Sequence, residues 1–335
     1  VASKRWIYHQ YDTTVRTSTA VRPGGDSGVI RIRGTERAIA ATTDCNGRFV
    51  YLDPRQGAMI AVAEAARNLV CSGAMPTAIT NNLNFGNPLK QHIYYQFREA
   101  VLGMADACKA FETPVTGGNV SFYNETDGQA IYPTPVIGMV GIIENVSHIS
   151  PQSFQSEGDD IVLLGENTAE IGGAEYLYVT AGLVAGFPPR VDLTHERQLQ
   201  RAVLTLIQEK ELRSAHDCSD GGLACTLAEC ALGDGEAPFG VNVVLDDALT
   251  PVETLFAESQ GRIVVSCAPD RTENVIRIAM DHGVPARKIG TVGGRGKPFS
   301  VAAVSGQIET DLTSLHQAYF GALPAIMNTP VSSKE

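Results

Sequence analysis

Two acidic residues and an amide are spaced so that they could share a hard cation. Asp44 directly follows a strand-like run, and Glu64 and Asn68 lie four residues apart in the Ala-rich segment 61–68. On a helix, that spacing places both side chains on one face. Mg²⁺ prefers oxygen ligands, commonly one or two carboxylates completed by phosphate oxygens and water. The alternative is that Glu64 pairs with Arg67 or Asn68 on a solvated helix face, and spacing alone favours this alternative.

A second acid-rich motif is HDCSDGG at residues 216–222, between two predicted helices. Ser219 or Asp220 is predicted to cap the second helix, and such a helix start offers backbone amides to an anion. Capping alone explains one acid. It does not explain two acids, a serine and a glycine pair within seven residues. Two interpretations therefore remain open, a plain helix cap and an anion-binding site.

Two polar segments each follow a short predicted strand. Residues 116–121 read TGGNVS, so two glycines would let a phosphate approach the backbone closely. Residues 80–88 read TNNLNFGNP, and asparagine both donates and accepts hydrogen bonds and tolerates left-handed turns. Neither segment is a Walker A loop or a dinucleotide fingerprint. A tight turn is the alternative for each segment.

The elements that would position these motifs alternate between strand and helix. Asp53-Pro54 opens a helix with the proline in its first turn, and a polar segment at 147–158 separates two apolar blocks. The predicted strands cover residues 29–33, 37–42, 78–80, 115–116, 136–143, 160–165, 240–245, 262–267 and 299–304, and the predicted helices cover 57–72, 91–111, 194–211, 221–233 and 270–282. This alternation predicts an α/β or α+β class. We expect one domain over 1–150, a second over 151–325, and a tail, 326–335, with fraying from Pro324 onward.

Composition narrows the class of protein. The length of 335 residues favours two domains, and 44% hydrophobic with 19% charged residues fit a packed globular protein. A net charge of −11 disfavours a broad nucleic-acid surface, although it allows a small phosphate ligand bridged by metal ions.

No apolar run reaches the ~18–20 residues of a membrane helix. The seven cysteines are scattered without a CxxC pair, which predicts reduced thiols in a cytoplasm. The chain starts at Val1 without an initiator Met or a signal peptide, so we expect a piece of a longer chain.

Taken together and in order, the motifs are far more specific than any one of them. TTDC at 42–45, AEAARN at 63–68, TNNLNFGNP at 80–88, PVTGGNVSFYNET at 114–126 and HDCSDGGL at 216–223 resemble the second half of the formylglycinamidine ribonucleotide synthase family, in its small-subunit type. That family belongs to the aminoimidazole ribonucleotide synthetase-like superfamily of ATP-dependent enzymes. The resemblance runs from Arg5-Trp6 to about Leu323.

The resemblance implies a fold and a reaction. The fold is a module with an N-terminal α/β domain and a C-terminal α+β domain, and the N-terminal sheets of two modules pack into a shared barrel. In the reaction, ATP activates the amide oxygen of formylglycinamide ribonucleotide as an iminophosphate, and ammonia then displaces phosphate to form the amidine. The ammonia comes from glutamine through a separate glutaminase subunit, and a small third subunit bridges the two. Mg²⁺ spans the phosphates of ATP and neutralises developing charge.

By the same resemblance, two groups of residues would meet a nucleotide. In the first group, Asn81 and Gly118 would contact ATP, Asn119 would help to hold Mg²⁺, and Ser121 would lie near the substrate. In the complementary group, Asp44, Glu64, Asn68 and Asp217 would coordinate Mg²⁺, and Thr43 and Ser219 would touch the nucleotide. The complementary site holds a nucleotide with a structural role in large family members.

Two departures from the family pattern change what we expect of this chain. Many relatives have Asp where Asn81 stands, so direct metal ligation by Asn81 is disfavoured. The catalytic His motif of the family's first repeat is absent, because the corresponding opening here is Tyr8-His9-Gln10-Tyr11-Asp12. We therefore expect no catalytic residue in this chain and no turnover by the chain alone, with the first repeat as its partner. A lone second repeat would expose an apolar sheet face, so we expect it to form a homodimer.

Two other functions stay open. The chain could be a non-catalytic, nucleotide-binding half that stabilises its partner repeat. It could also be a stand-alone superfamily enzyme such as aminoimidazole ribonucleotide synthetase. The missing His motif and the TGGNVSFYNET match count against the stand-alone enzyme.

Overall fold

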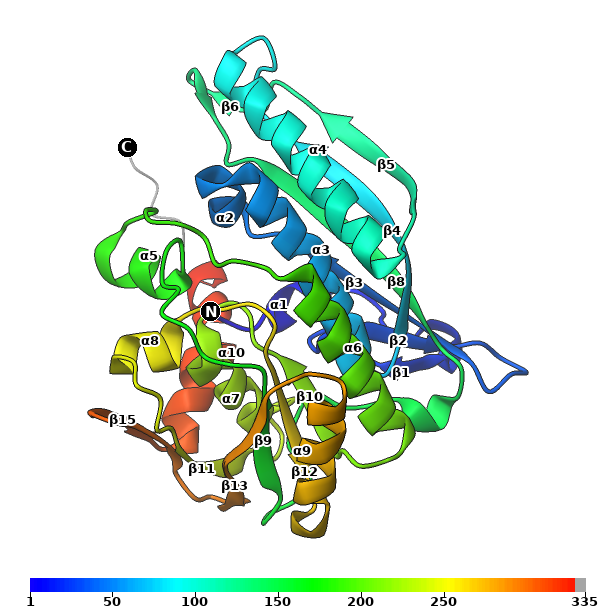
Figure 1. The fold of residues 1–335 in the computed structure, drawn as a ribbon, viewed down its shortest axis with the longest axis vertical. Coiled ribbons are helices and arrows are strands. Elements are labelled where there is room, and N and C mark those ends of the chain that lie inside the picture. Colours follow the sequence, from blue (N-terminus) through cyan, green and yellow to red (C-terminus); the bar gives the residue numbers. More distant parts are fainter. Residues whose placement is uncertain (329–335) are drawn as a thin grey trace.

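Two β-sheets organise the chain. The computed structural model describes residues 1–328, with a six-stranded sheet built from residues 19–143 and a seven-stranded sheet built from residues 160–310. The first sheet and its helices form the upper part of Figure 1, and the second sheet forms the lower part. The predicted division at residue 150 falls between these two sets of strands.

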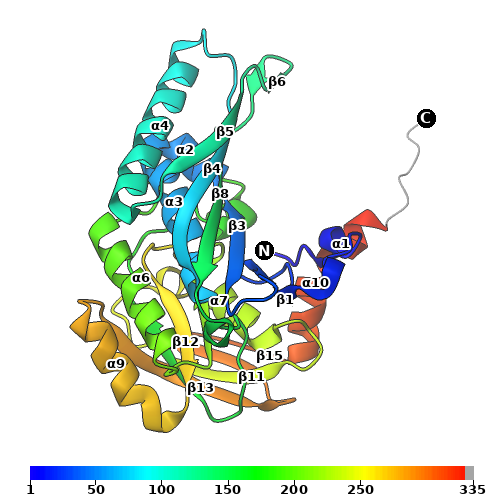
Figure 2. The ribbon, with the colours of Figure 1, turned by 90° about the vertical axis from the view of Figure 1, so that its right-hand side faces the viewer.

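The first sheet has one covered face and one open face. Its strands, in order across the sheet, are β1 (Thr19–Val21), β2 (Gly28–Arg31), β3 (Ala38–Asp44), β8 (Thr134–Ile143), β4 (Met75–Asn84) and β5 (Val115–Ser121). Only β4 and β5 are parallel, because α4 (Gln91–Phe111) carries the chain across between them. Figure 2 shows α4, α2 (Gly47–Leu52) and α3 (Pro54–Cys71) on the same side of this sheet. A small hairpin of β6 (Glu125–Thr126) and β7 (Gln129–Ala130) follows β5.

Helix α3 begins where the sequence predicts and lies at the centre of the molecule. The Asp53 side chain accepts hydrogen bonds from the backbone N–H groups of Arg55 and Gln56, and Pro54 occupies the first turn. Its alanines allow close packing on nearly all sides, against the sheet, α4, and α6 (Leu193–Gln208) of the second half. The contact with α4 is so close that a Cβ on Gly103 would lie 2.2 Å from the Arg55 carbonyl oxygen.

The second sheet is covered on both faces. Its order is β10 (Ser214–Asp217), β12 (Ile263–Cys267), β9 (Asp160–Leu164), β13 (Ala286–Arg295), β11 (Phe239–Val244), β14 (Phe299–Ala303) and β15 (Gly306–Thr310). Helices α6 and α9 (Thr272–Asp281) pack on one face, and α7 (Gly222–Leu232), α8 (Pro251–Phe256) and α10 (Leu312–Met327) pack on the other. Strands β9 and β12 are buried throughout, which explains why their sequences read as continuous apolar runs.

The sequence did not predict the 16-residue helix α10 or most of the short elements. They include α1 (Arg5–Tyr8), α5 (Glu175–Ala181) and three 3₁₀ turns at Val15–Thr17, Val146–His148 and Pro269–Arg271. Strand β13 was also not predicted, because its glycines interrupt the alternation of apolar residues. Its pairing with β9 is irregular between Lys288 and Gly290. Among residues 1–328, no helix is both long and apolar enough to cross a bilayer.

The expected fraying beyond Pro324 is wrong for the residues that the structure describes. Helix α10 continues through Pro324 to Met327, and the Asn328 N–H donates to the Pro324 carbonyl. Pro324 has no N–H to donate to the Phe320 carbonyl, so the helix continues through it with one hydrogen bond of its ladder missing. The Asp311 side chain caps the start of this helix by accepting from the Ser314 N–H. The rest of the predicted tail, from residue 329, lies outside the described residues.

Candidate functional site

Strand register brings the predicted ATP residues together. Asn81 of β4 is paired with Gly118 of β5, and Ile137 of β8 connects this pair to Asp44 of β3 in one row across the sheet. Asn81 lies directly against Gly118, since a Cβ on Gly118 would come 2.0 Å from the Asn81 Oδ1 atom. The glycine is therefore required by its neighbour in the sheet, not by a turn. Asp44 is three strand spacings from Gly118, roughly 14 Å, so the two predicted groups are distinct places on the sheet.

Asn119 and Ser121 lie on the opposite, open face. Their register partners are Asn82 and Asn84, whose neighbour Leu83 points into the core with the helices. Because side chains alternate along a strand, Asn119 and Ser121 point the other way. The Asn119 Nδ2–H donates to the Asn82 Oδ1 atom at 3.2 Å. The four side chains form a polar patch at one end of the open face.

Both polar segments lie largely within strands, whereas a tight turn was the alternative that the sequence left open for each. TNNLN at residues 80–84 belongs to β4, and TGGNVS at residues 116–121 belongs to β5, which is an edge strand. Asparagine and glycine disfavour strands when considered alone. Here backbone pairing with β8 and between β4 and β5 overrides that preference. The alternative of a tight turn is therefore wrong for residues 80–84 and 116–121, whose polar side chains are held in a fixed register.

The complementary group converges at the junction of the two halves. The Asn68 Nδ2–H donates to the Asp44 Oδ2 atom at 2.8 Å, so β3 and α3 meet as the spacing of polar residues predicts. Burial, and then the charge of Asp217, raises the pKa of Asp44 well above its ordinary value. Burial, and then the charge of Asp44, likewise raises the pKa of Glu64 well above its ordinary value.

Arg67 holds the fourth predicted metal ligand, Asp217. The Arg67 side chain is fully buried, and its Nε–H donates to the Asp217 Oδ1 atom at 2.6 Å. The Glu64 Oε2 atom lies 3.9 Å from a terminal nitrogen of the same guanidinium. This side of helix α3 is largely shielded from solvent. The alternative of a solvated Glu64–Arg67 pair is therefore wrong about solvation, because the second half of the chain covers this side of α3.

The site fits a cation only in part as the side chains now lie. Within residues 1–328, no three His, Cys, Asp or Glu side chains are grouped so that they could hold a metal ion. However, the Asp217 Oδ2 atom is buried and has no hydrogen-bond partner among the described residues. A buried carboxylate oxygen without a partner suits a hard divalent cation, but the neighbouring carboxyl groups do not lie close enough to complete a three-ligand set.

The start of α7 differs from the predicted cap. Gly221, in a left-handed conformation with φ of 81°, is the N-cap residue, and no side chain caps this helix. Gly221 donates its backbone N–H to the Glu258 Oε1 atom at 2.8 Å. Ser219 and Asp220 therefore lie before the helix as free side-chain positions, and Asn46 donates to Asp220 at 3.3 Å. The amide expected to meet an anion is already bound to a carboxylate of the same chain.

Thr43 and Ser219 are placed differently relative to the carboxyl groups. Thr43 alternates with Asp44 on β3 and so points to the open face of the sheet. Ser219 follows β10 by two residues, on the side of the junction where Asp217 lies. Thr43 and the carboxylate group thus lie on opposite faces of the first sheet.

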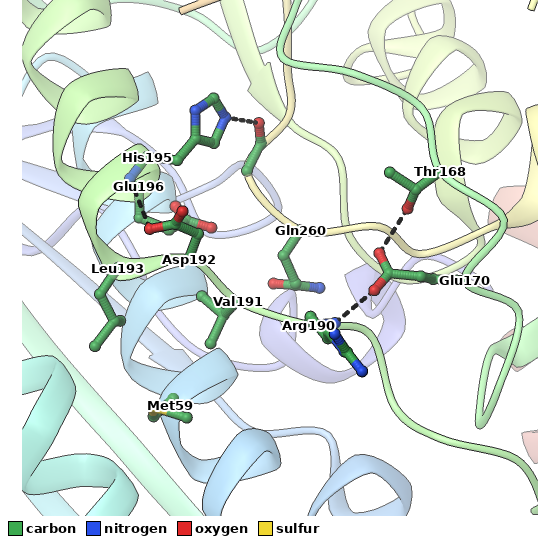
Figure 3. Close-up of a pocket in the computed structure, with 11 residues that line it drawn as sticks. Met59, Thr168, Glu170, Arg190, Val191, Asp192, Leu193, His195, Glu196 and Gln260 are labelled. Carbon is green, nitrogen blue, oxygen red and sulfur yellow. Dashed lines mark hydrogen bonds between the residues drawn. The ribbon is translucent and has the colours of Figure 1, made fainter. Parts of the chain in front are cut away.

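A cavity of about 850 Å³ opens between α3 and the start of α6 (Figure 3). Met59, Val191 and Leu193 supply apolar surface, and Thr168, Glu170 and Gln260 supply polar groups. Glu170 accepts from the Thr168 hydroxyl at 2.6 Å and from the Arg190 backbone N–H at 2.7 Å. Glu196 and Gln260 line the cavity and also bind Arg67, which connects the cavity wall to Asp217.

Comparison with known proteins agrees with this architecture. Residues 24–143 match the family described as AIR synthase related protein, N-terminal domain, and residues 156–302 match the corresponding C-terminal domain. The chain belongs to the AIR synthase-related proteins. Its open sheet face, central α3 and fully covered second sheet are thus features of one AIR synthase-related module.

The module is similar to known synthase subunits. The chain is 52% identical over 325 residues to the phosphoribosylformylglycinamidine synthase subunit PurL of Thermoanaerobacter sp. strain X514, covering 96% of this chain and 44% of that protein. PurL of T. maritima complexed with FGAR matches with a TM-score of 0.73 at 20% identity, over 88% of this chain and 48% of that one. PurL of T. maritima complexed with ATP matches with a TM-score of 0.69 at 21% identity, over 87% and 46%. The chain spans less than half the length of these relatives.

Sequence reasoning missed the partners of Arg67. It considered this residue only as a surface partner of Glu64, and it did not consider Glu196 or Gln260. One signal was available, since Arg67 is a lone cation in an Ala-rich helix whose other small residues predict burial. A buried guanidinium needs several acceptors, but the sequence could not say which residues supply them.

Proposed function

We propose that the chain is the second, C-terminal module of an ATP-dependent formylglycinamidine ribonucleotide synthase. The observation that carries this proposal is 52% identity over nearly the whole chain to a PurL subunit more than twice as long. The absence of the first repeat's His motif from the opening of the chain supports the second position. In this proposal the amide oxygen of formylglycinamide ribonucleotide attacks the γ-phosphate of ATP and ADP leaves. Ammonia then attacks the activated carbon, and phosphate leaves.

The polar patch on the open face is the proposed contribution to the active site. Gly118 would meet ATP through its backbone, beside Asn81, while Asn119 would help to hold Mg²⁺ and Ser121 would contact the substrate. These residues lie on two faces of β4 and β5, but β5 is an edge strand, so one ligand at that edge could reach both faces. Mg²⁺, when bound, would neutralise charge on the transferring phosphoryl group. The chain's own groups would orient ligands by hydrogen bonds.

The rest of the open face supports the first repeat as partner. Ile30, Ile39 and Val140 lie exposed toward the end of the sheet away from the polar patch. An exposed apolar surface on a packed domain is typical of an interface. A partner module on this surface would bring its own residues next to Asn119 and Ser121. A glutaminase subunit and a small bridging subunit would complete the ammonia supply.

The test uses the full enzyme with both modules. We expect Asn119→Ala and Ser121→Ala to reduce kcat/KM by roughly 10²-fold, because positioned polar contacts to a reacting phosphoryl group contribute on that scale. Thr77→Ala, on the same strand pair but away from the polar patch, is the control and should keep normal turnover. Normal turnover in both test variants would contradict the proposed active-site role.

The complementary group supports a second, structural role. Asp44, Glu64 and Asn68 are partly buried at the junction of the two halves, where a bound Mg²⁺–nucleotide would hold β3, α3 and β10 together, with Ser219 as a further contact. Thr43, on the other face of the sheet, is left out of this proposal. Binding there would stabilise the folded state by mass action. Millimolar MgADP should therefore raise the melting temperature of the wild-type chain, and should fail to raise that of Asp44→Asn. An equal rise in both proteins would remove this site from the proposal.

A further inference from the structure

A cavity of about 420 Å³ lies in the second half of the chain, away from both proposed nucleotide sites. Strands β13, β11, β14 and β15 line it, together with the turn between β13 and β14. Across this sheet, β11 is four strand spacings, roughly 19 Å, from β10, a strand that contacts α3 of the first half. Figure 1 shows β11, β13 and β15 at the opposite end of the molecule from β4 and β5. A ligand in this cavity would therefore meet a different set of residues.

Strand register places four polar side chains of this cavity in one row. Asn242 of β11 is paired with Thr291 of β13 and with Ser300 of β14, and Ser300 is in turn paired with Glu309 of β15. Their neighbours along the strands belong to the core under α7, α8 and α10, namely Val241, Val243, Val292, Phe299, Val301 and Ile308. Because side chains alternate along a strand, the four polar side chains all point to the other face. The core under α6 and α9 on that face is formed mainly with β9, β10 and β12, so the row lies beside those helices.

A basic turn forms one wall of the cavity. The turn at residues 295–298 folds back against the sheet, where a Cβ on Gly240 would lie only 2.7 Å from the Lys297 Cβ atom. The absence of a side chain at Gly240 thus lets the turn stand this close to β11. Arg295 is occupied elsewhere, since its guanidinium lies 5.2 Å from the centre of the Phe239 ring. Lys297 is therefore the cation that the turn brings to the cavity.

The polar groups of the cavity are largely uncommitted. Three of its side chains make no hydrogen bond or ion pair within residues 1–328, namely those of Thr291, Asn242 and Lys297. The Gln307 amide donates to the Ser300 hydroxyl at 3.3 Å and to the Glu309 Oε2 atom at 3.1 Å, which leaves the Glu309 Oε1 atom available. The cavity thus presents hydroxyl, amide and carboxylate groups in a row, with an ammonium group beside them.

This combination of groups matches one class of ligand. Hydroxyl, amide and carboxylate side chains supply both the donors and the acceptors that sugar hydroxyls need, and a carboxylate is a common acceptor for ribose hydroxyls. A lysine ammonium binds phosphate as a point charge. We propose that the cavity binds a phosphorylated sugar, with the phosphate at Lys297 and the hydroxyls along Asn242 and Glu309. The row spans three strand spacings, roughly 14 Å, which is more than a lone inorganic anion would occupy.

The experiment is a saturation-transfer NMR titration of the full 335-residue chain with ribose 5-phosphate, without Mg²⁺ or ATP. The wild-type chain should bind this probe, and Lys297→Met should bind it at least about tenfold more weakly, because a charge-assisted contact to phosphate is lost. Lys109→Met removes an exposed lysine of α4 and is the matched control, with wild-type affinity expected. A plain solvated sheet face predicts no saturable binding by the wild-type chain. That result, or equal affinities of Lys297→Met and wild type, would overturn the inference.

Variants of the row test recognition of the sugar. Asn242→Ala and Glu309→Gln should each weaken binding of ribose 5-phosphate at least about fivefold, the scale of one or two lost hydrogen bonds. Both side chains are exposed, so both variants should fold, as judged by unchanged circular dichroism. Ser121→Ala, in the proposed active site, should keep wild-type affinity for this probe. Binding that Ser121→Ala abolishes and Asn242→Ala leaves intact would place the probe on the first sheet and overturn the inference.

Two further probes define the ligand. Inorganic phosphate should bind at least about tenfold more weakly than ribose 5-phosphate, because it makes none of the hydroxyl contacts. Equal affinities would mean a simple phosphate site and would contradict a sugar ligand. AMP carries the same phosphorylated sugar within a nucleotide. Displacement of ribose 5-phosphate by AMP would assign the group to a nucleotide, whereas failure to displace it would assign a free sugar phosphate, and both results support the shared chemistry.

Discussion

His216, the first residue of the HDCSDGG motif, joins two carboxylates from other parts of the chain, which its residue type alone does not predict. It is buried, with Nδ1 2.7 Å from the Asp26 Oδ1 atom and Nε2 3.1 Å from the Glu229 Oε2 atom. Burial alone would lower the pKa of His216, but the Asp26 charge and the two hydrogen bonds outweigh it and raise the pKa well above the ordinary value of 6.5. The imidazolium thus links the N-terminal segment, β10 and α7.

The pH dependence of stability tests this arrangement. Because the folded-state pKa of His216 is raised, its contribution to stability is complete below pH 6.5 and is lost as the pH rises toward the folded value. The raised pKa of buried Asp26 acts in the same direction. The free energy of unfolding, from urea titrations at pH 6 and pH 9, should fall more in wild type than in His216→Gln. If the unfolding free energy changes with pH equally in wild type and His216→Gln, the His216–Asp26 pair keeps one charge state between pH 6 and pH 9.

Glu258 is a second buried group whose charge matters. Burial, and then the Asp220 charge, raises the pKa of Glu258 to about 7. Its Oε1 atom accepts from the backbone N–H groups of both Gly221 and Glu175, at 2.8 Å each. One carboxylate therefore joins the start of α7 to the start of α5.

Helix α5 depends on few contacts of this kind. It buries no side chain, and it is held by the Glu258 bond, by the Arg48–Glu175 ion pair and by Tyr176 stacked on Phe256. Helix α3 is the opposite case, with a face of small residues buried on nearly every side. The two helices differ because α3 has a complementary surface on three sides, whereas α5 has a few polar contacts and one aromatic stack.

Limited proteolysis measures the attachment of α5. Replacing Glu258 by Ala removes the acceptor of two backbone N–H groups, so protease cleavage within residues 175–187 should become several-fold faster at pH 8. Glu166→Ala, an exposed carboxylate of the same connecting segment, is the control and should be cut at the wild-type rate. Unchanged cleavage in Glu258→Ala would show that the aromatic stack and the ion pair suffice.

Close packing of α3 on α4 gives a second test among the elements. Gly103→Ala would place a Cβ 2.2 Å from the Arg55 carbonyl oxygen, although alanine usually favours a helix by about 1 kcal/mol over glycine. We expect the steric effect to win, with a loss of about 2 kcal/mol in the free energy of unfolding. Gly28→Ala, whose Cβ would meet nothing within 4 Å, should cost little. A stabilised Gly103→Ala protein would mean that the two helices can separate at no cost.

The whole molecule is asymmetric in what it leaves uncovered. Its second sheet is buried on both faces, whereas its first sheet is covered by helices on one side only (Figure 2). An uncovered sheet face with exposed Ile30, Ile39 and Val140 favours association with another sheet. In the proposed enzyme that partner is the first repeat, and for the isolated chain we expect a second copy.

Sedimentation of the isolated chain tests the role of this face. The wild-type chain should sediment as a dimer at micromolar concentration, whereas Ile39→Lys combined with Val140→Lys should sediment as a monomer. These two side chains already point to the open face, so the folded state should tolerate the change. A monomeric wild-type chain, or dimers of the double variant, would contradict self-association through this sheet.

The sequence by itself determined those elements of the fold that depend on interactions between residues close in the chain. Asp53-Pro54 sets the start of α3, the apolar periodicity of residues 91–111 sets α4 at its observed bounds, and apolar runs mark β9 and β12. The ordered motifs also pointed to the AIR synthase-related proteins, and the family matches over residues 24–143 and 156–302 confirm that family. These features depend on neighbours within a few turns or on residue identity alone.

Only the tertiary structure decided the state of the candidate site. Asparagines and glycines of β4 and β5 became strands because backbone partners from elsewhere in the chain overrode their preference for turns. Arg67 became a buried hub because Asp217, 150 positions away, lies against it, together with Glu196 and Gln260. Burial and pairing at such distances depend on how the two halves pack, and no local pattern encodes that packing.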